Sequence, residues 1–539
     1  MSLGLNFSRT LLITGALGCF AVALFAQQDD PPARVARLNY LTGSVSMRPA
    51  AADDWINAEP NRPFTNGDSV YTDMDGRAEF HSDIAAIRVG PSANLRFAQL
   101  TDQEMQLQLS DGDIHLHVHH LGLSETFEID LPNATVTLLR DGNYRLRVDS
   151  VAQVSFLVVR SGTAEVNAFG QAATINPGHS ILLSGTNNAP FNIAQAPGED
   201  DFDRWCHQRD DHEAHLASLR YVPPTLIGYE DLDDNGGWEQ TAQYGAIWYP
   251  RAVPADWAPY RFGHWVWIAP WGWTWVDQAN WGFAPFHYGR WVFVSGRWGW
   301  SPGPIVVAQN APPVHPHYAP ALVAWVGGPH VGVAVSVGAP LAWVTLGFGE
   351  LYTPPYHCSQ HYFSNVNVNN TRVVNNVNIT NVYQTVYVNK TVYNQTYVHM
   401  SSPNAVVAMP QAAMASGKPV HQQAVVLKKE DIQNMQPAAA PAFVKSPPVV
   451  AAAPVARPPA PAGFAKASPQ PQPFAAPSQP TRPPQPVAPA AVAKPVAAQV
   501  TSPRPAAHEY PEMTKRTPPP PAPKKEEKKK DEHKDKKSD

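Results

Sequence analysis

Short segments in which hydrophobic and polar residues alternate run through residues 35–183. Alternation with a period of two gives a strand one buried and one polar face. Turn residues such as Asn66-Gly67, Asp75-Gly76 and Asp141-Gly142 separate the segments and tolerate a positive φ at low cost. The pattern therefore predicts an all-β domain over residues 33–190 rather than βαβ units. The predicted strands cover residues 37–40, 44–47, 78–81, 86–89, 105–109, 114–118, 135–139, 144–148 and 154–159.

A helical period follows at residues 200–222. Phe202, Trp205, Leu216 and Leu219 supply an apolar stripe with many charges between them, and Pro223 stops the helix. We expect one connecting helix here, docked by its apolar stripe on a flanking domain.

Residues 228–362 form a second predicted domain, which is rich in tryptophan. Eleven of the 16 Trp residues lie between Trp248 and Trp300, and Trp265-Val266-Trp267 followed by Trp271-Gly272-Trp273 recurs as Trp291-Val292-Phe293 followed by Trp298-Gly299-Trp300. A repeat of this length is typical of one supersecondary unit, here a β-hairpin with alternating Trp. Two interpretations stay open: the rings build an aromatic core, or outward rings form a platform that stacks on sugars or peptides. The candidate ligand-binding residues are Trp265, Trp267, Trp271, Trp273, Trp275, Trp291, His264, His287 and Arg290.

The C-terminal third changes composition twice. Asn and Val alternate with Thr and Tyr over residues 363–400, which predicts further strands with a polar face. Residues 401–539 are rich in Pro and Ala and end in a Lys/Glu run, so we expect a disordered tail.

The N-terminus predicts export. Residues 1–26 have one positive charge, Arg9, then an apolar stretch that ends before a polar, acidic segment, as in a signal peptide. A secreted or periplasmic location, with cell-surface association, is the expectation that follows. The alternative is an uncleaved anchor, for which about 16 apolar residues are short of the ~20 that span a bilayer. After cleavage Cys206 and Cys358 remain, and they either form one disulfide in an oxidising compartment or stay as two buried free thiols. No other stretch reaches transmembrane length.

Composition and charge narrow the functional classes. The chain has 539 residues, 16% of them charged, and a net charge of −5, which gives no basic surface for nucleic acid. Of the 56 prolines, 26 lie between Pro437 and Pro523, so that region is not packed core. Phosphate-loop, zinc-protease and serine-hydrolase motifs are missing, so we expect a protein that is not an enzyme and uses no cofactor. His115, His117 and His119 share one face of a predicted strand, and we interpret them as a solvated polar face rather than metal ligands, because successive residues on a face lie nearly 7 Å apart.

The first predicted domain resembles FecR-type domains over about 150 residues. The family includes extracytoplasmic regulators that relay a signal from an outer-membrane receptor to a sigma factor, and also many secreted modules without a known role. The relay would need an internal transmembrane helix, which this chain lacks. The residues that carry the resemblance are Thr42-Gly43-Ser44-Val45, Trp55, Asn66-Gly67-Asp68-Ser69-Val70-Tyr71-Thr72, Gly76-Arg77-Ala78-Glu79, Ile87-Arg88-Val89, Ser92, Gly112-Asp113-Ile114 and Gly142-Asn143-Tyr144-Arg145.

The second predicted domain resembles a family of uncharacterised secreted bacterial proteins in which a FecR-type domain precedes a tryptophan-rich region. The resemblance covers residues 35–362 and implies an envelope or extracellular protein with no known activity. It rests on Gly228-Tyr229-Glu230-Asp231-Leu232-Asp233, Gly237-Trp238, Tyr244-Gly245, Trp248-Tyr249-Pro250, Trp257-Ala258-Pro259-Tyr260-Arg261, Gly272-Trp273-Thr274-Trp275-Val276, Trp281-Gly282-Phe283-Ala284-Pro285-Phe286-His287-Tyr288-Gly289-Arg290-Trp291 and Trp300-Ser301-Pro302-Gly303.

Three functions remain in view. The favoured one is a non-enzymatic secreted or periplasmic envelope protein that acts as an interaction or scaffolding module, with an envelope protein or polysaccharide as partner. The alternatives are an extracytoplasmic signalling component of FecR type, which would need a membrane partner, and a glycan-binding module that uses exposed Trp.

Overall fold

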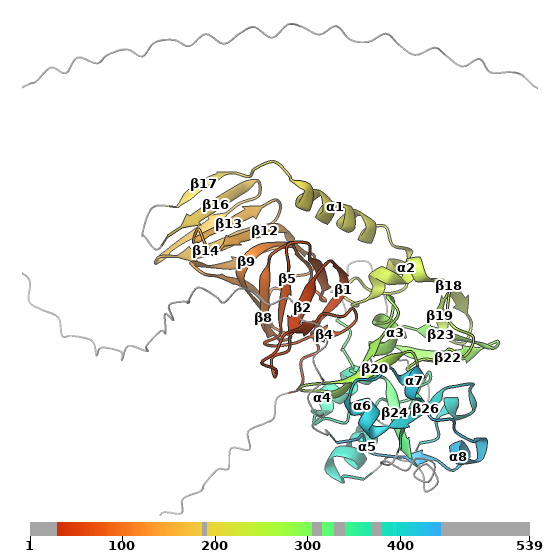
Figure 1. Cartoon of the computed structure of the whole chain (residues 1–539). Helices are drawn as coiled ribbons and strands as arrows, with labels where there is room; N and C mark the ends of the chain where they lie inside the picture. Colours follow the sequence, from red (N-terminus) through yellow and green to blue (C-terminus); the bar gives the residue numbers. More distant parts are fainter. Residues whose placement is uncertain are drawn as a thin grey trace, which may run out of the picture. The chain divides into compact units, whose positions relative to one another are not determined.

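The computed structural model describes residues 30–185, 191–303, 315–327, 340–368, 379–391, 393 and 395–442. Strands dominate these residues and helices are few and short (Figure 1), which confirms the all-β prediction. The predicted signal peptide lies outside the described residues. None of the described helices is long and apolar enough to cross a membrane.

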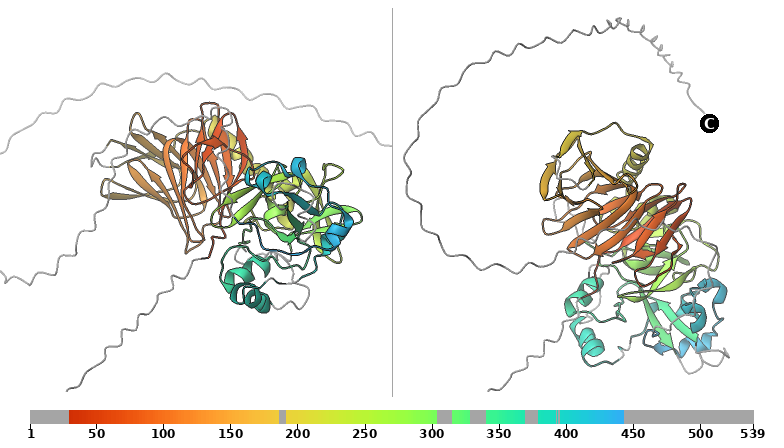
Figure 2. Two further views of the ribbon diagram at one scale, coloured as in Figure 1. Left: turned by 60° about the horizontal axis from the view of Figure 1, so that its bottom comes forward. Right: turned by 60° about the vertical axis from the view of Figure 1, so that its left-hand side comes forward.

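The strands β1–β17 form two sheets that share one long strand, β9 (Figures 1 and 2). Sheet A has the order β4-β1-β6-β7-β9-β12-β13-β16-β17, and sheet B has the order β3-β2-β5-β8-β9-β10-β11-β14-β15. Neighbouring strands are antiparallel except β9 and β10. The strands are β1 Ala36–Thr42, β2 Val45–Arg48, β3 Ile56–Asn57, β4 Pro63–Phe64, β5 Ser69–Thr72, β6 Arg77–His81, β7 Ala85–Val89, β8 Asn94–Leu100, β9 Glu104–Val118, β10 Thr126–Leu131, β11 Ala134–Leu138, β12 Gly142–Asp149, β13 Val154–Val159, β14 Ala164–Ala168, β15 Gln171–Ile175, β16 His179–Ser184 and β17 Asn192–Gln195.

Strand β9 passes from sheet B to sheet A at Gly112. The sequence predicts two strands with a turn at Asp111-Gly112, whereas the structure has one strand with an irregularity there. Gly112 has φ +83°, and a Cβ on it would lie 2.4 Å from the Cα of Ala93, so only glycine fits. The irregularity shifts the alternation: Met105, Leu107 and Leu109 are buried before it, and Ile114, Leu116 and Val118 after it. Both halves of the strand therefore point into one core.

Helix α1 (Asp201–Glu213) follows the sheets. Its first turn has a capping box in which Asp200 accepts from the backbone of Asp203 and the Asp203 side chain accepts from the backbone N–H of Asp200. Phe202 and Cys206 are buried, and the charged residues of the same face lie on the outer side of sheet A. Short helical turns continue the chain: η1 Ala217–Arg220, η2 Tyr229–Asp231 and α2 Leu232–Asn235.

Two hairpins organise the tryptophan-rich region. In one, β20 pairs with β21, which places Trp265 opposite Trp275 and Trp267 opposite Trp273. In the other, β22 pairs with β23 and places Trp291 opposite Trp300, within a four-stranded sheet of order β18-β19-β23-β22. The elements are β18 Gly236–Thr241, β19 Gly245–Pro250, β20 Gly263–Ile268, β21 Gly272–Asp277, α3 Ala284–His287, β22 Arg290–Val294 and β23 Arg297–Ser301.

The predicted strands of residues 363–400 are wrong where the structure describes them. The chain forms helix α4 (Gln360–Val368), helix α5 (Ile379–Tyr383) and a π-helical turn η3 (Gln384–Val388) instead. Tyr362, Phe363 and Val366 reach the aromatic core from one face of α4, so tertiary burial outweighs the strand propensity of the Asn/Val pattern.

The predicted disordered tail is also wrong over residues 401–442. Val406 to Met409 are buried and form strand β26 (Val406–Pro410), an apolar run too short to stand out in the Ala/Pro composition. It belongs to a sheet of order β26-β25-β24-β27; residues 443–539 lie outside the described part. The remaining elements are β24 Val323–Gly327, β25 Pro340–Thr345, η4 Val398–Ser401, α6 Gln411–Ala415, α7 Val420–Gln423, α8 Lys429–Gln433 and β27 Gln436–Pro437.

From their burial in the two hairpins, we expect different tryptophans to contribute very different amounts to the free energy of unfolding. Trp291 is 1% exposed and packs against the rings of Trp257, Trp281 and Phe286, so we expect Trp291→Ala to destabilise the chain by about 3–5 kcal/mol. Trp267 is 41% exposed, and Trp267→Ala serves as the matched control with a cost below about 1.5 kcal/mol. Urea unfolding followed by circular dichroism measures both, and equal costs would contradict the central place of Trp291.

Candidate functional site: a buried ion-pair network

The outer face of sheet A carries charged and polar side chains. Because Ala36, Leu38, Ala78, Phe80 and Ile87 point into the core, their neighbours Arg37, Asn39, Glu79, His81 and Arg88 point to the opposite face. All of these but Asn39 are buried nevertheless, since helix α1 and the turn η2 cover that face. A set of charges that the strand pattern would expose is thus held away from water.

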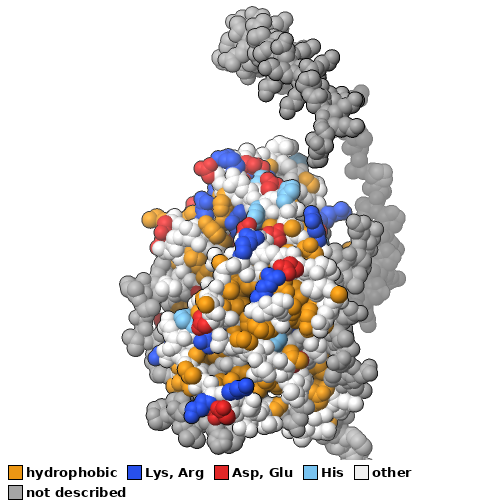
Figure 3. Space-filling model, turned by 90° about the vertical axis from the view of Figure 1, so that its right-hand side faces the viewer, with side chains coloured by type: hydrophobic (Ala, Val, Ile, Leu, Met, Phe, Trp, Pro, Cys, Tyr) orange, Lys and Arg blue, Asp and Glu red, His pale blue; other side chains and the backbone are white. Residues whose placement is uncertain are grey.

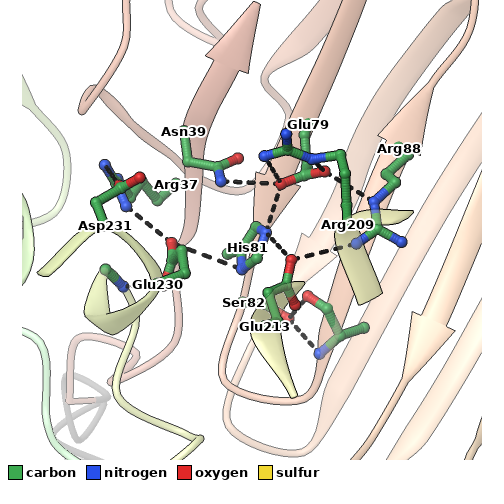
Figure 4. Close-up of polar contacts among 12 residues, drawn as sticks. Arg37, Asn39, Glu79, His81, Ser82, Arg88, Arg209, Glu213, Glu230 and Asp231 are labelled. Carbon is green, nitrogen blue, oxygen red and sulfur yellow. Dashed lines mark hydrogen bonds and ion pairs between the residues drawn. The ribbon is translucent and has the colours of Figure 1, made fainter. Parts of the chain in front are cut away.

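The carboxylate of Glu79, which is completely buried, lies at the centre of this ion-pair network (Figure 4). Its Oε1 accepts from Asn39 Nδ2 at 2.9 Å and lies 2.8 Å from His81 Nε2. Its Oε2 accepts from Arg88 Nε at 2.7 Å, and the Arg209 guanidinium donates to both oxygens. Strands β1, β6 and β7 and helix α1 therefore meet on one side chain.

Helix α1 contributes three charged residues, two adjacent ones and a third about one turn later. Arg209, Asp210 and Glu213 share the face that meets the sheet. Arg88 NH1 donates to Asp210 at 2.5 Å, and Arg88 NH2 donates to Glu213 at 3.2 Å. Arg88 alone thus joins strand β7 to two positions of the helix.

The turn η2 extends the network to the tryptophan-rich region. Arg37 donates to Glu230 at 2.8 Å and to the carbonyl of Asn280 at 2.6 Å, and it also pairs with Asp231 at 2.5 Å. Asn61, which accepts from Arg37, donates to the carbonyl of Asp277 at 3.0 Å. The hydrophobic cores of the β1–β17 sheets and of the tryptophan-rich region are separate clusters, and this polar junction lies between them.

The electrostatics follow from burial among opposite charges. Burial alone would raise the pKa of Glu79, but Arg88, His81 and Arg209 outweigh it and hold that pKa well below its usual range. Burial would lower the pKa of His81, yet the carboxylates of Glu230, Glu213 and Glu79 raise it to about 9. Burial raises the pKa of Glu213, which has other carboxylates beside it. At neutral pH the His81 imidazole is a cation and part of the network.

Glu79, His81 and Glu213 together offer a donor set that metal ions can use, since their ligand atoms all lie within 4.8 Å of one another. The Glu79 oxygens, however, already accept from two guanidinium groups, and Arg88 also donates to Glu213. A divalent cation would have to enter beside these positive charges and displace their hydrogen bonds. The geometry fits an internally neutralised ion-pair network better than a metal centre.

The structure places the sequence-predicted ligand-binding residues mainly inside the protein. Trp265, Trp271, Trp273, Trp275 and Trp291 are buried. Rings held in this way have no outward face for a ligand, so these five belong to the aromatic core, the first of the two interpretations. Only Trp267 of the predicted rings is exposed, at 41%.

The three predicted polar residues of the array do not form one site. His287 is buried, and its Nδ1 lies 2.7 Å from the carbonyl of Ala319. Arg290 is buried and donates to the carbonyls of Glu350 and Gly289. His264 is half-buried and lies 3.4 Å from a carboxylate oxygen of Glu59. His287 and Arg290 thus hold backbone carbonyls in separate places, and His264 faces a side-chain carboxylate.

Cys206 and Cys358 are free and buried, so the disulfide alternative is wrong for this structure. Cys206 lies on α1 in the first half of the described chain, and Cys358 precedes α4. Burial raises the pKa of both thiols, that of Cys358 to about 12. They behave as small apolar core residues.

The histidine run is only partly a solvated face. His115 is completely buried because α1 covers it, and its ring lies 6.1 Å from that of His207. Burial, with Arg88 nearby, lowers the pKa of His115 to about 3. His117 lies 2.8 Å from Asp210 of α1. The prediction of a solvated face is therefore wrong for His115, and its reason is the docked helix.

Comparison with known proteins adds one family. Residues 229–350 match the model of a family of unknown function (DUF6600). No curated protein matches the chain. Two solved structures of a candidate anti-sigma factor from Parabacteroides distasonis are similar at 15% and 12% identity, with TM-scores of 0.19 and 0.22. The matches cover 21% and 26% of this chain and 51% and 64% of those chains, and the FecR resemblance stays a prediction.

The network predicts a large cost of removing the central charge. Glu79→Gln leaves Arg88, Arg209 and His81 facing one another in a buried site, and we expect a loss of about 3–5 kcal/mol of unfolding free energy. Glu239→Gln is the control, because Glu239 pairs with Arg297 on the surface, where such a pair is worth about 0–1 kcal/mol. Urea unfolding at pH 7 compares them; a Glu79→Gln cost as small as that of the control would contradict the network.

Because of His81, we expect the free energy of unfolding to fall at alkaline pH. Its pKa is about 9 in the folded chain and about 6.5 unfolded, so its contribution is complete below pH 6.5 and is lost as the pH rises through 9. Relative to His81→Gln, the wild-type chain should lose on the order of 2–3 kcal/mol between pH 6.5 and 9.5. Urea midpoints across this range measure the difference, and an NMR titration of His81 near pH 6.5 would refute it.

Proposed function

We propose that this protein is a non-enzymatic interaction or scaffolding module of the bacterial envelope. The observation that carries the proposal is the ion-pair network: its buried Glu79, His81, Arg88 and Arg37 face one another across three elements rather than a cavity. A catalytic site needs perturbed groups that reach a substrate. Here the groups with shifted pKa values bind one another and so hold the sheets, helix α1 and the tryptophan-rich region in place. This supports a structural role.

The partner we propose is a protein rather than a polysaccharide. Burial of Trp265, Trp275 and Trp291 removes the rings that would stack on sugars. On the face drawn in Figure 3, hydrophobic side chains gather in the middle and charged side chains lie mostly above and below them. An apolar area with a polar rim is typical of protein interfaces.

The location we propose rests on the N-terminal sequence, with cleavage after Ala26 and export to the periplasm or the cell surface. Two buried free thiols mean that the fold does not depend on a disulfide from the oxidising compartment.

The proposal predicts a binding pattern for the full chain expressed in a Gram-negative bacterium. We expect the mature protein to begin at Gln27, to be found outside the cytoplasm and to sediment with envelope fractions that retain their proteins. It should not sediment with protein-free peptidoglycan sacculi, because burial removes five of the six tryptophan rings predicted to form a stacking platform. Fractionation, N-terminal sequencing and quantitative co-sedimentation measure these outcomes.

A chain without residues 1–26 is the control and should stay in the cytoplasm. Retention on protein-free sacculi would favour the glycan-binding alternative. Hydrolysis of the sacculi by the purified chain would overturn the non-enzymatic assignment.

A further inference from the structure

A groove of about 510 Å³ lies beside strand β24, within the size range of ligand sites. We call it the tyrosine groove, after Tyr356, Tyr387, Tyr393 and Tyr397, whose half-buried rings line it together with Trp325. Pro354, Pro355 and the small residues Ala438, Ala439 and Ala440 also line it, and the polar lining residues are Thr353, His357, Lys390 and Thr391. The lining is thus mainly aromatic and apolar with some polar side chains, and it lies outside the ion-pair network.

The chain's own Pro/Ala segment already forms one wall of this groove. Gln436 and Pro437 pair with Gly327 and Val326 of β24, and the N–H of Ala438 donates to the carbonyl of Trp325 at 2.9 Å. Farther along, Trp273 Nε1 donates to the carbonyl of Pro441 at 3.0 Å. These contacts recognise an extended backbone rather than particular side chains, and of the two hydrogen bonds only the one at Ala438 needs an N–H of the segment, which proline lacks.

Aromatic-lined grooves bind proline-rich segments for a physical reason. A polyproline II segment is already extended, so it loses little conformational entropy on binding, and its prolines pack flat against aromatic rings while a ring N–H donates to a free carbonyl. The tyrosine groove has the rings, and beside it Trp273 already holds the carbonyl of Pro441 in the segment that leads to the next residues of the chain.

We propose that the tyrosine groove is a binding site for an extended proline-rich peptide, and that its occupant is residues 443–466 of the same chain. The described chain reaches Ala442 directly after the docked wall segment. The next 24 residues contain Pro447, Pro448, Pro454, Pro458, Pro459 and Pro461. A segment tethered at the rim of a groove has an effective concentration in the millimolar range, well above what a free peptide reaches. This inference goes beyond the proposed function, because it concerns how the chain holds its own Pro/Ala region.

Pulse proteolysis of the full chain with elastase tests the proposal. Elastase cleaves after Ala and Val, and the chain contains two similar stretches that follow a proline: residues 449–453 (VVAAA), inside the proposed occupant, and residues 490–493 (AAVA), outside it. We expect cleavage in residues 449–453 to be about tenfold slower than in residues 490–493. This ratio follows if the millimolar effective concentration of the tethered segment is about ten times its dissociation constant, because the segment is then bound about nine-tenths of the time. Mass spectrometry of the fragments gives both rates in one sample.

Tyr393→Ala removes a ring from the groove and should bring the two rates together. Tyr244→Ala is the matched control, since Tyr244 is also half-buried but packs against Phe348 away from the groove, and it should keep the tenfold difference. If Tyr393→Ala disturbs the fold, the wild-type chain provides a second test. A synthetic peptide of residues 446–462, added in excess, should displace the tethered segment and speed its cleavage.

Equal rates in the wild-type chain would overturn the proposal, as would a difference that survives Tyr393→Ala. A difference that disappears on dilution would also overturn it, because the occupant would then come from a second copy of the chain.

Discussion

A carboxylate without any contact to water must be matched by positive charge and hydrogen-bond donors, or it destabilises the fold by several kcal/mol. Glu79 is such a group, and the chain surrounds it with Arg88, Arg209, His81 and Asn39. These partners come from three strands and one helix, so meeting the needs of one side chain fixes the position of all four elements. Arg37 and Glu230 carry the same constraint on to the tryptophan-rich region.

Most strands of the β1–β17 sheets could be predicted from the sequence, because their core side chains alternate with polar ones along each strand. Alternation places Ile114, Leu116 and Val118 inside, and the Gly112 position marks where the rule changes phase. The tryptophan hairpins follow the same rule, since the repeat of Trp265 and Trp291 lies within short, antiparallel pairs. Local periodicity is enough wherever a neighbour in sequence is also the neighbour in the sheet.

The ion-pair network could not be read in this way. Glu79 and Arg88 stand at outward strand positions, where a charge ordinarily faces water. Their partners on the helix that buries them lie 130 and 122 residues farther along the chain. The predictions for helix α4 and strand β26 are wrong for a related reason. The composition of α4 favours a strand and that of β26 favours disorder, but residues distant in the sequence bury Phe363 and Met409 and so determine the structure. The sequence shows that the connecting helix and the strands of sheet A carry charged residues. It does not show that these charges pair with one another in the folded chain.

A buried ion-pair network is a costly way to join two regions, because apolar residues of similar volume would desolvate no charge. What it adds is selectivity of arrangement: an apolar interface tolerates sliding and rotation, whereas Arg88 can satisfy Glu79, Asp210 and Glu213 at once in only one position of helix α1. Displacement of the helix by one turn would leave at least one of these charges buried and unpaired. The network therefore fixes the geometry between the two regions, and a fixed geometry is what the proposed scaffolding role would require.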